Sequence, residues 1–250
     1  MTASNSHDRA SDTMLALGST TTLVIAPHPD DEIFGCGGLL HRLKSAGGRV
    51  YVLYITVGDT ADFSAKGLST AEERLEEIAQ VARLLDFDGY TVALPGNEYH
   101  LKLDAVPQGV LVHAIERAGE ISLQGLRPDI VLAPSISDYN QDHRAIGFAV
   151  MTALRPGPRS YKSFQSLVLS YELPYQQWNV ADSLPTPSLF VTLDQKSMAA
   201  KIAALELYQS QLKSPESPLS VHGVEALATY RGLQCGVTRA EAFQIKRFVI

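Results

Sequence analysis

The chain has 250 residues, of which 45% are hydrophobic and 19% charged, as is ordinary for a folded protein with a sizeable core. The formal net charge of -6 argues against a nucleic-acid partner or an anionic membrane surface, because either would attract a basic face. Two cysteines without CxxC spacing argue against a disulfide framework and a thiolate zinc site, and no apolar run is long enough for a membrane span, so a cytoplasmic protein is expected.

The first part of the chain predicts alternating strands and helices. Residues 1–18 are polar, lack the pattern of a signal peptide and are expected to be a disordered leader. Strands are predicted at 21–26, 49–56, 89–94 and 128–134, and helices at 32–48, 69–85, 104–120 and 142–154. This repetition is typical of an α/β fold, in which a mostly parallel sheet has helices on both faces.

The pattern changes after Pro156. Two further strands, at 166–174 and 188–193, are separated by a proline-rich loop and are expected to pair at the sheet edge. A long helix is predicted at 194–212 with Asp194 as its cap, and segments 221–234 and 238–250 complete the chain. We find no internal repeat and no linker between two cores, so residues 19–250 are expected to form a single domain.

A run of polar residues, His28-Pro29-Asp30-Asp31-Glu32, comes directly after the first predicted strand. A helix start explains a proline at the first position and acids in the first turn. It does not require a histidine at the strand end, nor two adjacent aspartates whose charges repel each other when they lose water. The run as a whole is therefore interpreted as functional.

A second polar cluster, SDYNQDHRAIG, follows the fourth predicted strand and again opens a helix. Ligands of doubly wound sheets bind outside the carboxyl ends of the strands, so the two clusters are expected to converge on one crevice. Imidazole nitrogen and carboxylate oxygen suit a zinc ion, and three protein ligands leave one position open for water. An acid that is not a ligand can then serve as a general base.

The segment APHPDDE resembles the AHPDDE signature of the zinc-dependent de-N-acetylases, the PIG-L and LmbE-like family. This family includes the N-acetylglucosaminyl-phosphatidylinositol deacetylases and the deacetylases of mycothiol and bacillithiol biosynthesis. The resemblance continues through Arg74 and Glu77, NQDHRAIG, SYE, KIAALELYQSQ and RGLQCGVTRAEAF. It implies a Rossmann-like three-layer sandwich with extra C-terminal strands and helices.

The resemblance also implies a role for individual residues. His28, Asp31 and His143 match the family's zinc ligands, which implies one Zn²⁺ per chain, and another divalent metal would suit the same donors. Asp30 matches the general base that takes a proton from zinc-bound water. The reaction implied is hydrolysis of the acetamide of a small amino sugar or glycoconjugate, which releases acetate and a free amine.

The second cluster departs from the family pattern, in which H-P-D-H is frequent. This chain has Asn140-Gln141-Asp142-His143. The amide of Asn140 can donate a hydrogen bond to an oxyanion, but it has no proton to give to the leaving amine. Protonated Asp30 is expected to return that proton, and two roles stay open for Asp142, which are support of the loop and a share in the proton transfer.

Candidate substrate contacts also lie outside the two clusters. Asp59 follows the second predicted strand, and Arg74 lies in the second predicted helix, where a pair with Glu77 is an alternative role. His100 and His222 are weaker candidates for lining a pocket. The glycines of GCGG are interpreted as small residues that pack a helix against the sheet.

Two other functions stay open on the sequence alone. A metal-dependent hydrolase of esters, phosphate esters or other amides would need cationic residues at the site, and the motifs supply only Arg144. A metal-binding family member with altered catalysis is favoured by Asn140 and opposed by Asp30, because a purely structural zinc site would have a fourth ligand. A homo-oligomer is compatible with either function.

Overall fold

The computed structural model describes residues 17–61, 66–176 and 186–249. The strands are β1 Thr21–Ala26, β2 Arg49–Val57, β3 Thr60–Ala61, β4 Leu68–Ser69, β5 Gly89–Pro95, β6 Ile130–Ala133, β7 Leu167–Tyr171, β8 Leu189–Thr192 and β9 Ala240–Phe248. The α-helices are α1 Asp31–Ser45, α2 Ala71–Leu84, α3 Gln108–Arg117, α4 Leu123–Leu126, α5 Gln141–Ala153, α6 Gln195–Leu207 and α7 Val221–Gln234. Two short 3-10 helices, η1 Leu17–Ser19 and η2 Leu103–Ala105, complete the described elements.

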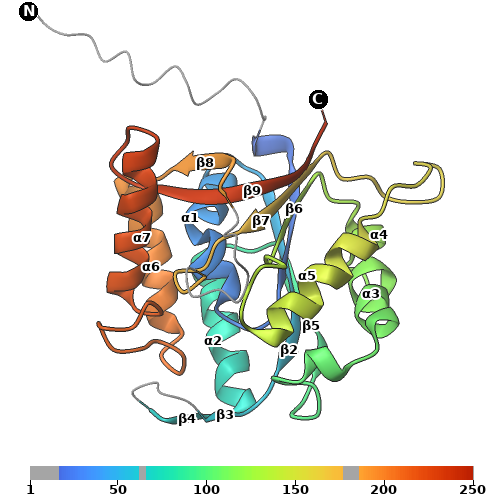
Figure 1. The fold of residues 1–250 in the computed structure, drawn as a ribbon, viewed down its shortest axis with the longest axis horizontal. Coiled ribbons are helices and arrows are strands. Elements are labelled where there is room, and N and C mark those ends of the chain that lie inside the picture. Colours follow the sequence, from blue (N-terminus) through green and yellow to red (C-terminus); the bar gives the residue numbers. More distant parts are fainter. Residues whose placement is uncertain (1–16, 62–65, 177–185, 250) are drawn as a thin grey trace, which may run out of the picture.

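Seven of the strands form one sheet in the order β5-β2-β1-β6-β7-β9-β8, and β3 and β4 form a separate small pair. The first five strands of that order are parallel, while β9 is antiparallel to both of its neighbours. Helices α1, α2, α6 and α7 cover one face of the sheet, and α3, α4 and α5 cover the other (Figure 1). The structure therefore confirms the predicted α/β layers and the mostly parallel sheet.

Strand β1 lies between the two layers of helices, which explains its continuous apolar sequence. Leu23 and Ile25 point into the core beneath α3 and α5, whereas Val24 and Ala26 point into the core beneath α1 and α6. A strand that is buried on both faces carries apolar residues at successive positions, because neither face of the strand contacts water. None of the described helices is both long enough and apolar enough to cross a membrane.

Two helix starts that the sequence predicts are confirmed. Thr70 accepts a hydrogen bond from the Glu73 backbone N–H, and the Glu73 side chain accepts one from the Thr70 N–H, so α2 begins with a capping box. Asp194 caps α6 by accepting a hydrogen bond from the Ser197 N–H. Both starts depend on contacts between residues three apart, which sequence spacing reveals.

The C-terminal strands differ from the prediction. Residues 166–174 and 188–193 do contribute β7 and β8 at this end of the sheet, but the two strands do not pair with each other, because β9 lies between them. No strand was predicted for residues 240–248, which form β9 in the structure. Only the packing of distant segments explains why Glu241 is buried there.

Helix α1 is interrupted at Cys36, whose φ of -150° and ψ of 16° are not helical. Two N–H groups that follow the break, those of Gly38 and Leu39, donate to the Glu241 carboxylate at 2.9 and 2.8 Å. The Lys201 ammonium group donates to a backbone carbonyl just before the break, and it also pairs with Glu241 at 2.7 Å. A buried ion pair from α6 and β9 therefore satisfies the polar groups that the break exposes.

The small residues of GCGG allow α1 to approach its neighbours closely. A Cβ atom on Gly35 would lie 2.4 Å from the Tyr171 ring, and one on Gly38 would lie 2.6 Å from Leu193. Both distances are far shorter than a van der Waals contact. The interpretation of these glycines as packing residues is confirmed.

The predicted leader is described only at its end. Residues 1–16 lie outside the described residues, and Leu17 and Gly18 belong to η1. A Cβ atom on Gly18 would lie 2.2 Å from the Ala46 carbonyl oxygen. Residues 17–19 therefore lie directly against the end of α1.

Candidate metal and active site

The two polar clusters meet at the carboxyl ends of β1 and β6. His28 follows β1, and Asp31 is the first residue of α1. His143 lies in the first turn of α5, which follows β6. Since β2 lies on one side of β1 and β6 on the other, the chain reverses its direction of winding here, which is where doubly wound sheets bind ligands.

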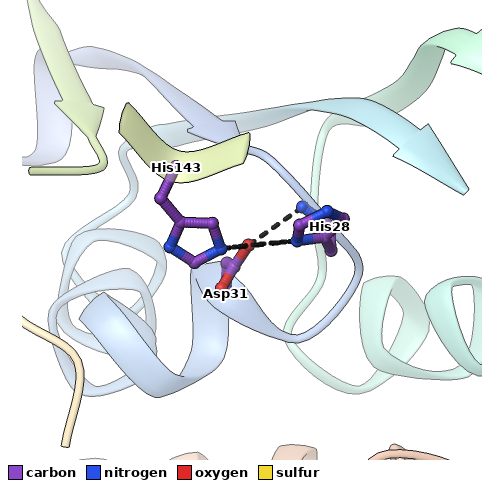
Figure 2. A group of neighbouring side chains, drawn as sticks. All are labelled: His28, Asp31 and His143. Carbon is purple, nitrogen blue, oxygen red and sulfur yellow. Dashed lines mark hydrogen bonds and ion pairs between the residues drawn. The ribbon is translucent and has the colours of Figure 1, made fainter. Parts of the chain in front are cut away.

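His28, Asp31 and His143 bring three donor atoms together (Figure 2). Asp31 Oδ2 lies 3.3 Å from His143 Nε2 and 3.5 Å from His28 Nδ1, and the two nitrogens are 3.3 Å apart. In a tetrahedral zinc site with bonds of about 2.0–2.1 Å, neighbouring ligand atoms are separated by about 3.3–3.4 Å. The three residues therefore have the spacing of three corners of such a tetrahedron, and the fourth corner is left for a small ligand.

The outer nitrogens of both imidazoles are bound to buried aspartates. His28 Nε2 lies 2.9 Å from Asp142 Oδ2, and His143 Nδ1 lies 3.1 Å from Asp138 Oδ2. When each imidazole is neutral and donates the N–H of its outer nitrogen to the aspartate, the inner nitrogen that faces Asp31 keeps its lone pair. Two lone pairs and a carboxylate converge in a buried space, and this donor set suits a divalent cation.

The charges of the site also favour a cation. Although burial opposes a charged imidazole, the carboxylates of Asp31 and Asp138 raise the pKa of His143 to about 10. Burial likewise opposes ionisation of Asp31, but the imidazoles of His143 and His28 hold its pKa below the usual range. A metal ion that binds here must displace the proton on His143.

Asp142 accepts hydrogen bonds through both of its oxygens, one from the His28 ring and the other from the Leu103 N–H at 2.9 Å. Asp142 is fully buried. Of the two roles that the sequence left open, these contacts match support of the loop and orientation of His28. Asn140 is partly exposed, and its side-chain oxygen accepts a hydrogen bond from the Asp142 N–H at the start of α5.

Asp138 was not singled out from the sequence, although it lies within the second cluster. One of its oxygens accepts from His143 Nδ1 and from Gln176 Nε2, and the other accepts from the Asn140 N–H. Gln176 is far away in the chain, and nothing in the residue types distinguishes Asp138 from Asp142. The only sequence signal is its position, five residues before His143 in the same loop.

Asp30 directly precedes the donor residue Asp31 and is the one residue of the run 28–32 that is partly exposed. Burial of the carboxyl and the neighbouring Asp31 charge raise the pKa of Asp30 well above its usual value. A carboxyl group with a raised pKa, next in sequence to the donor residue Asp31, is a candidate for accepting a proton from a molecule bound at the open position.

The three predicted substrate contacts have different surroundings. Asp59 is exposed, and its carboxylate accepts from the Ala71 N–H and from Asn97 Nδ2, both at 2.8 Å, so it fixes the start of α2. Arg74 is buried and donates to the Pro29 carbonyl of the first cluster. His222 is exposed in the first turn of α7 and is not part of the donor group described above.

Two other polar residues clarify the surroundings of Arg74. Glu77 accepts hydrogen bonds from the backbone and side chain of Ser210, at 2.8 and 2.6 Å, rather than forming the predicted pair along α2. His100 is buried and lies edge-on to His28, with ring centroids 5.3 Å apart. Burial and the nearby His28 and Arg74 charges lower the pKa of His100 to about 3, so this imidazole is neutral.

The fold and the site define an α/β protein with a candidate metal site at the switch point of its sheet. Residues 23–154 match the family model described as GlcNAc-PI de-N-acetylase, PIG-L. The chain is 31% identical over 170 residues to 2'-N-acetylparomamine deacetylase of Streptomyces fradiae, a match that covers 62% of this chain and 57% of that protein. It is 26% identical over 227 residues to diacetylchitobiose deacetylase of Thermococcus kodakarensis, which covers 89% of this chain and 81% of that protein.

A solved structure with the same fold is that of the conserved protein TT1542 from Thermus thermophilus. The TM-score is 0.67 at 28% sequence identity, and the match covers 93% of this chain and 97% of that one. The chain belongs to the GlcNAc-PI de-N-acetylase family of deacetylases, as the match to more than half of its length shows. The resemblance seen in the sequence motifs is thereby confirmed.

Proposed function

We propose that this protein is a zinc-dependent deacetylase that hydrolyses the N-acetyl group of an amino sugar or of a small glycoconjugate. The observation that carries the proposal is the group of three donor atoms, 3.3–3.5 Å apart, with the partly exposed Asp30 beside it. The relatives named for acetylparomamine and diacetylchitobiose both act on N-acetylated amino sugars, which supports the same substrate class here.

His28, Asp31 and His143 would hold the zinc ion, with Asp142 and Asp138 orienting the two imidazoles. Zinc in such a site lowers the pKa of a coordinated water and polarises the carbonyl of the amide. The Asp30 carboxylate accepts the proton of the attacking water, and in its protonated form it returns that proton to the leaving nitrogen.

We assign Asn140 the role of assisting at the carbonyl oxygen. Its side-chain oxygen is used by the Asp142 N–H at 2.9 Å, so its amide NH₂ group is the part that can donate to a ligand. A neutral donor stabilises a developing oxyanion without supplying a proton. This division of roles leaves the proton transfer to Asp30.

The contacts of Arg144 argue against phosphate-ester hydrolysis as the function of this site. Its guanidinium donates to the backbone carbonyls of Asp138 and Tyr139, at 2.8 and 2.5 Å. The one cation of the second motif is therefore engaged in holding the loop. A phosphate ester would require a cation that points toward the substrate.

The proposal is tested by measuring acetate release from N-acetylglucosamine, diacetylchitobiose and an N-acetylated aminoglycoside. The protein is assayed after zinc loading, after chelation, and after zinc is restored, with an acetate ester and a phosphate ester as comparison substrates. We expect equal amounts of acetate and free amine from at least one sugar, with loss after chelation and recovery with zinc. Hydrolysis that survives chelation, or that is confined to the esters, would contradict the proposal.

A further prediction concerns the buried aspartate behind His143. Replacing Asp138 by asparagine removes the charge that orients the imidazole, and loss of such an outer partner typically costs about 10–100-fold in metal affinity. We expect this loss in a competition titration of the metal-free protein with a chromophoric chelator. Asp129→Asn, at the opposite end of β6, is the control and should bind zinc as the unmodified protein does. Equal affinities in the two variants would show that Asp138 does not orient His143.

A further inference from the structure

The peptide that joins Pro29 to Asp30 has an unusual orientation. Asp30 has a φ of 103°, in a region that residues with a side chain rarely occupy. Such a conformation costs on the order of 1–3 kcal/mol and persists only where its surroundings enforce it. Asp30 also immediately precedes α1, and its carbonyl accepts from the Ile33 and Phe34 N–H groups at 2.9 Å, so the carbonyl side of the residue is fixed by the helix.

Both polar ends of this peptide are held by buried side chains, those of Arg74 and Glu32. The Pro29 carbonyl accepts a hydrogen bond from Arg74 Nη2 at 3.1 Å. The Asp30 N–H donates to Glu32 Oε2, also at 3.1 Å. Arg74 is 2% exposed and Glu32 is fully buried. A guanidinium that donates to the peptide oxygen and a carboxyl oxygen that accepts from the N–H match the peptide dipole and hold the peptide plane from both of its ends.

The two side chains are in turn fixed by further buried contacts. Glu32 Oε1 accepts from the hydroxyl of Tyr54 at 3.0 Å and from that of Tyr208 at 2.5 Å. Arg74 Nη1 donates to Thr60 Oγ1 at 2.9 Å. These contacts come from β2, the end of α6 and β3, so three separate segments hold the pair in place.

We propose that Glu32 and Arg74 act as a clamp on the Pro29–Asp30 peptide, and that this clamp positions the Asp30 carboxylate for proton transfer. The inference rests on the proposed function, because it gives Asp30 the role of the base. Without the clamp the peptide can rotate, which relieves the strained φ of Asp30 and loosens the turn that holds Asp30 next to the donor residue Asp31. Glu32 and Arg74 are thus positioning residues, and neither transfers a proton.

The metal ligands are fixed by contacts that do not involve the clamp. The His28 N–H donates to Asp31 Oδ2 at 2.9 Å. This hydrogen bond joins the residues on either side of the Pro29–Asp30 peptide and does not involve the peptide itself. The rings of His28 and His143 are held by Asp142 and Asp138. Loss of the clamp is therefore expected to impair catalysis far more than metal binding.

The first test compares Glu32→Met with Glu32→Gln and Arg74→Met in the zinc-loaded protein. Misplacing a catalytic group by about 1 Å can cost roughly 100-fold in rate, so we expect kcat to fall about 10- to 100-fold in the two methionine variants, with KM and zinc content nearly unchanged. Glutamine keeps an oxygen that can accept from the Asp30 N–H, so Glu32→Gln should recover most of the turnover. A rise in KM without a fall in kcat in Arg74→Met would mark a substrate contact and overturn the clamp.

Coupling between residues gives the second test. If Glu32 and Arg74 hold one peptide, the double methionine variant should lose little more turnover than either single variant. In the Asp30→Asn background, the clamp variants should cause no further loss. A full additional loss in that background would overturn the clamp while leaving the proposed function intact. Full activity of Asp30→Asn itself would instead refute the base and the clamp together.

A readout without metal or substrate comes from hydrogen exchange of the Asp30 amide. In the metal-free protein this N–H should exchange slowly, and Glu32→Met should accelerate it selectively. Glu241→Met is the matched control, because Glu241 is a similarly buried acid that binds two N–H groups of the same helix far from the peptide. The control is expected to lower the melting temperature without accelerating exchange at Asp30 or changing kcat. An unchanged Asp30 exchange rate in Glu32→Met would overturn the clamp.

Discussion

Asp30→Asn is expected to retain zinc and to lose roughly 10²–10⁴-fold in turnover, the usual contribution of a general base. Asp30 is absent from the group of three donor atoms and is the partly exposed member of its cluster. An asparagine there has nearly the same shape but accepts no proton at neutral pH. The substitution therefore separates proton transfer from metal binding.

The measurement pairs elemental analysis with steady-state kinetics on the same preparation. Asp194→Asn is a matched control, because it makes the same chemical change at the start of another helix, where asparagine caps as well as aspartate does. The control should keep both zinc and turnover. Full turnover in Asp30→Asn would remove this residue as the base, and loss of zinc in that variant would make it a ligand instead.

His143→Ala is expected to lose the metal itself. Loss of an outer partner costs up to about 100-fold in affinity, so removal of a direct ligand should cost more than that. Asp31→Asn should also bind zinc weakly, and excess zinc should restore part of its activity because the amide oxygen still occupies the same place. His113→Ala, on the exposed face of α3, is the control and should bind one zinc per chain as before.

Zinc content and affinity, measured by elemental analysis and chelator competition, decide this prediction. Retention of a full zinc equivalent by His143→Ala would remove His143 from the site. Equal zinc loss in Asp31→Asn and Asp30→Asn would contradict the division of the aspartate pair into a ligand and a base. The two sets of variants together locate the metal and the proton acceptor separately.

Features that depend on short stretches of sequence were predictable. The apolar run of β1, the capping box of α2 and the Asp194 cap involve residues that are neighbours in the chain. The meeting of His28 and His143 also followed from the sequence, because carboxyl ends of parallel strands share one edge of a sheet. Periodicity and strand order were sufficient for these features.

Features that depend on distant partners were not predictable. Strand β9 was not predicted, because its place between β7 and β8 depends on packing. From the sequence alone, Glu241 in this strand would be taken for a surface residue, whereas in the structure it forms an ion pair with Lys201. Arg74 was expected to pair along its own helix or to contact a sugar, yet it donates to the Pro29 carbonyl. Such contacts depend on the direction in which a side chain points across the core, and this direction cannot be inferred from a single sequence.

The break in α1 has a consequence for the order in which the molecule is built. Glu241 lies 203 positions after Gly38, whose N–H it accepts. A chain that leaves the ribosome from its N-terminus therefore makes the helix that begins at Asp31 long before the strand that completes it. Until β9 docks, Gly38 and Leu39 lack their acceptor, and an unpaired buried N–H costs about 1–3 kcal/mol. The docking of β9, which completes the hydrogen bonds of α1, can thus occur only once nearly the whole polypeptide has been translated.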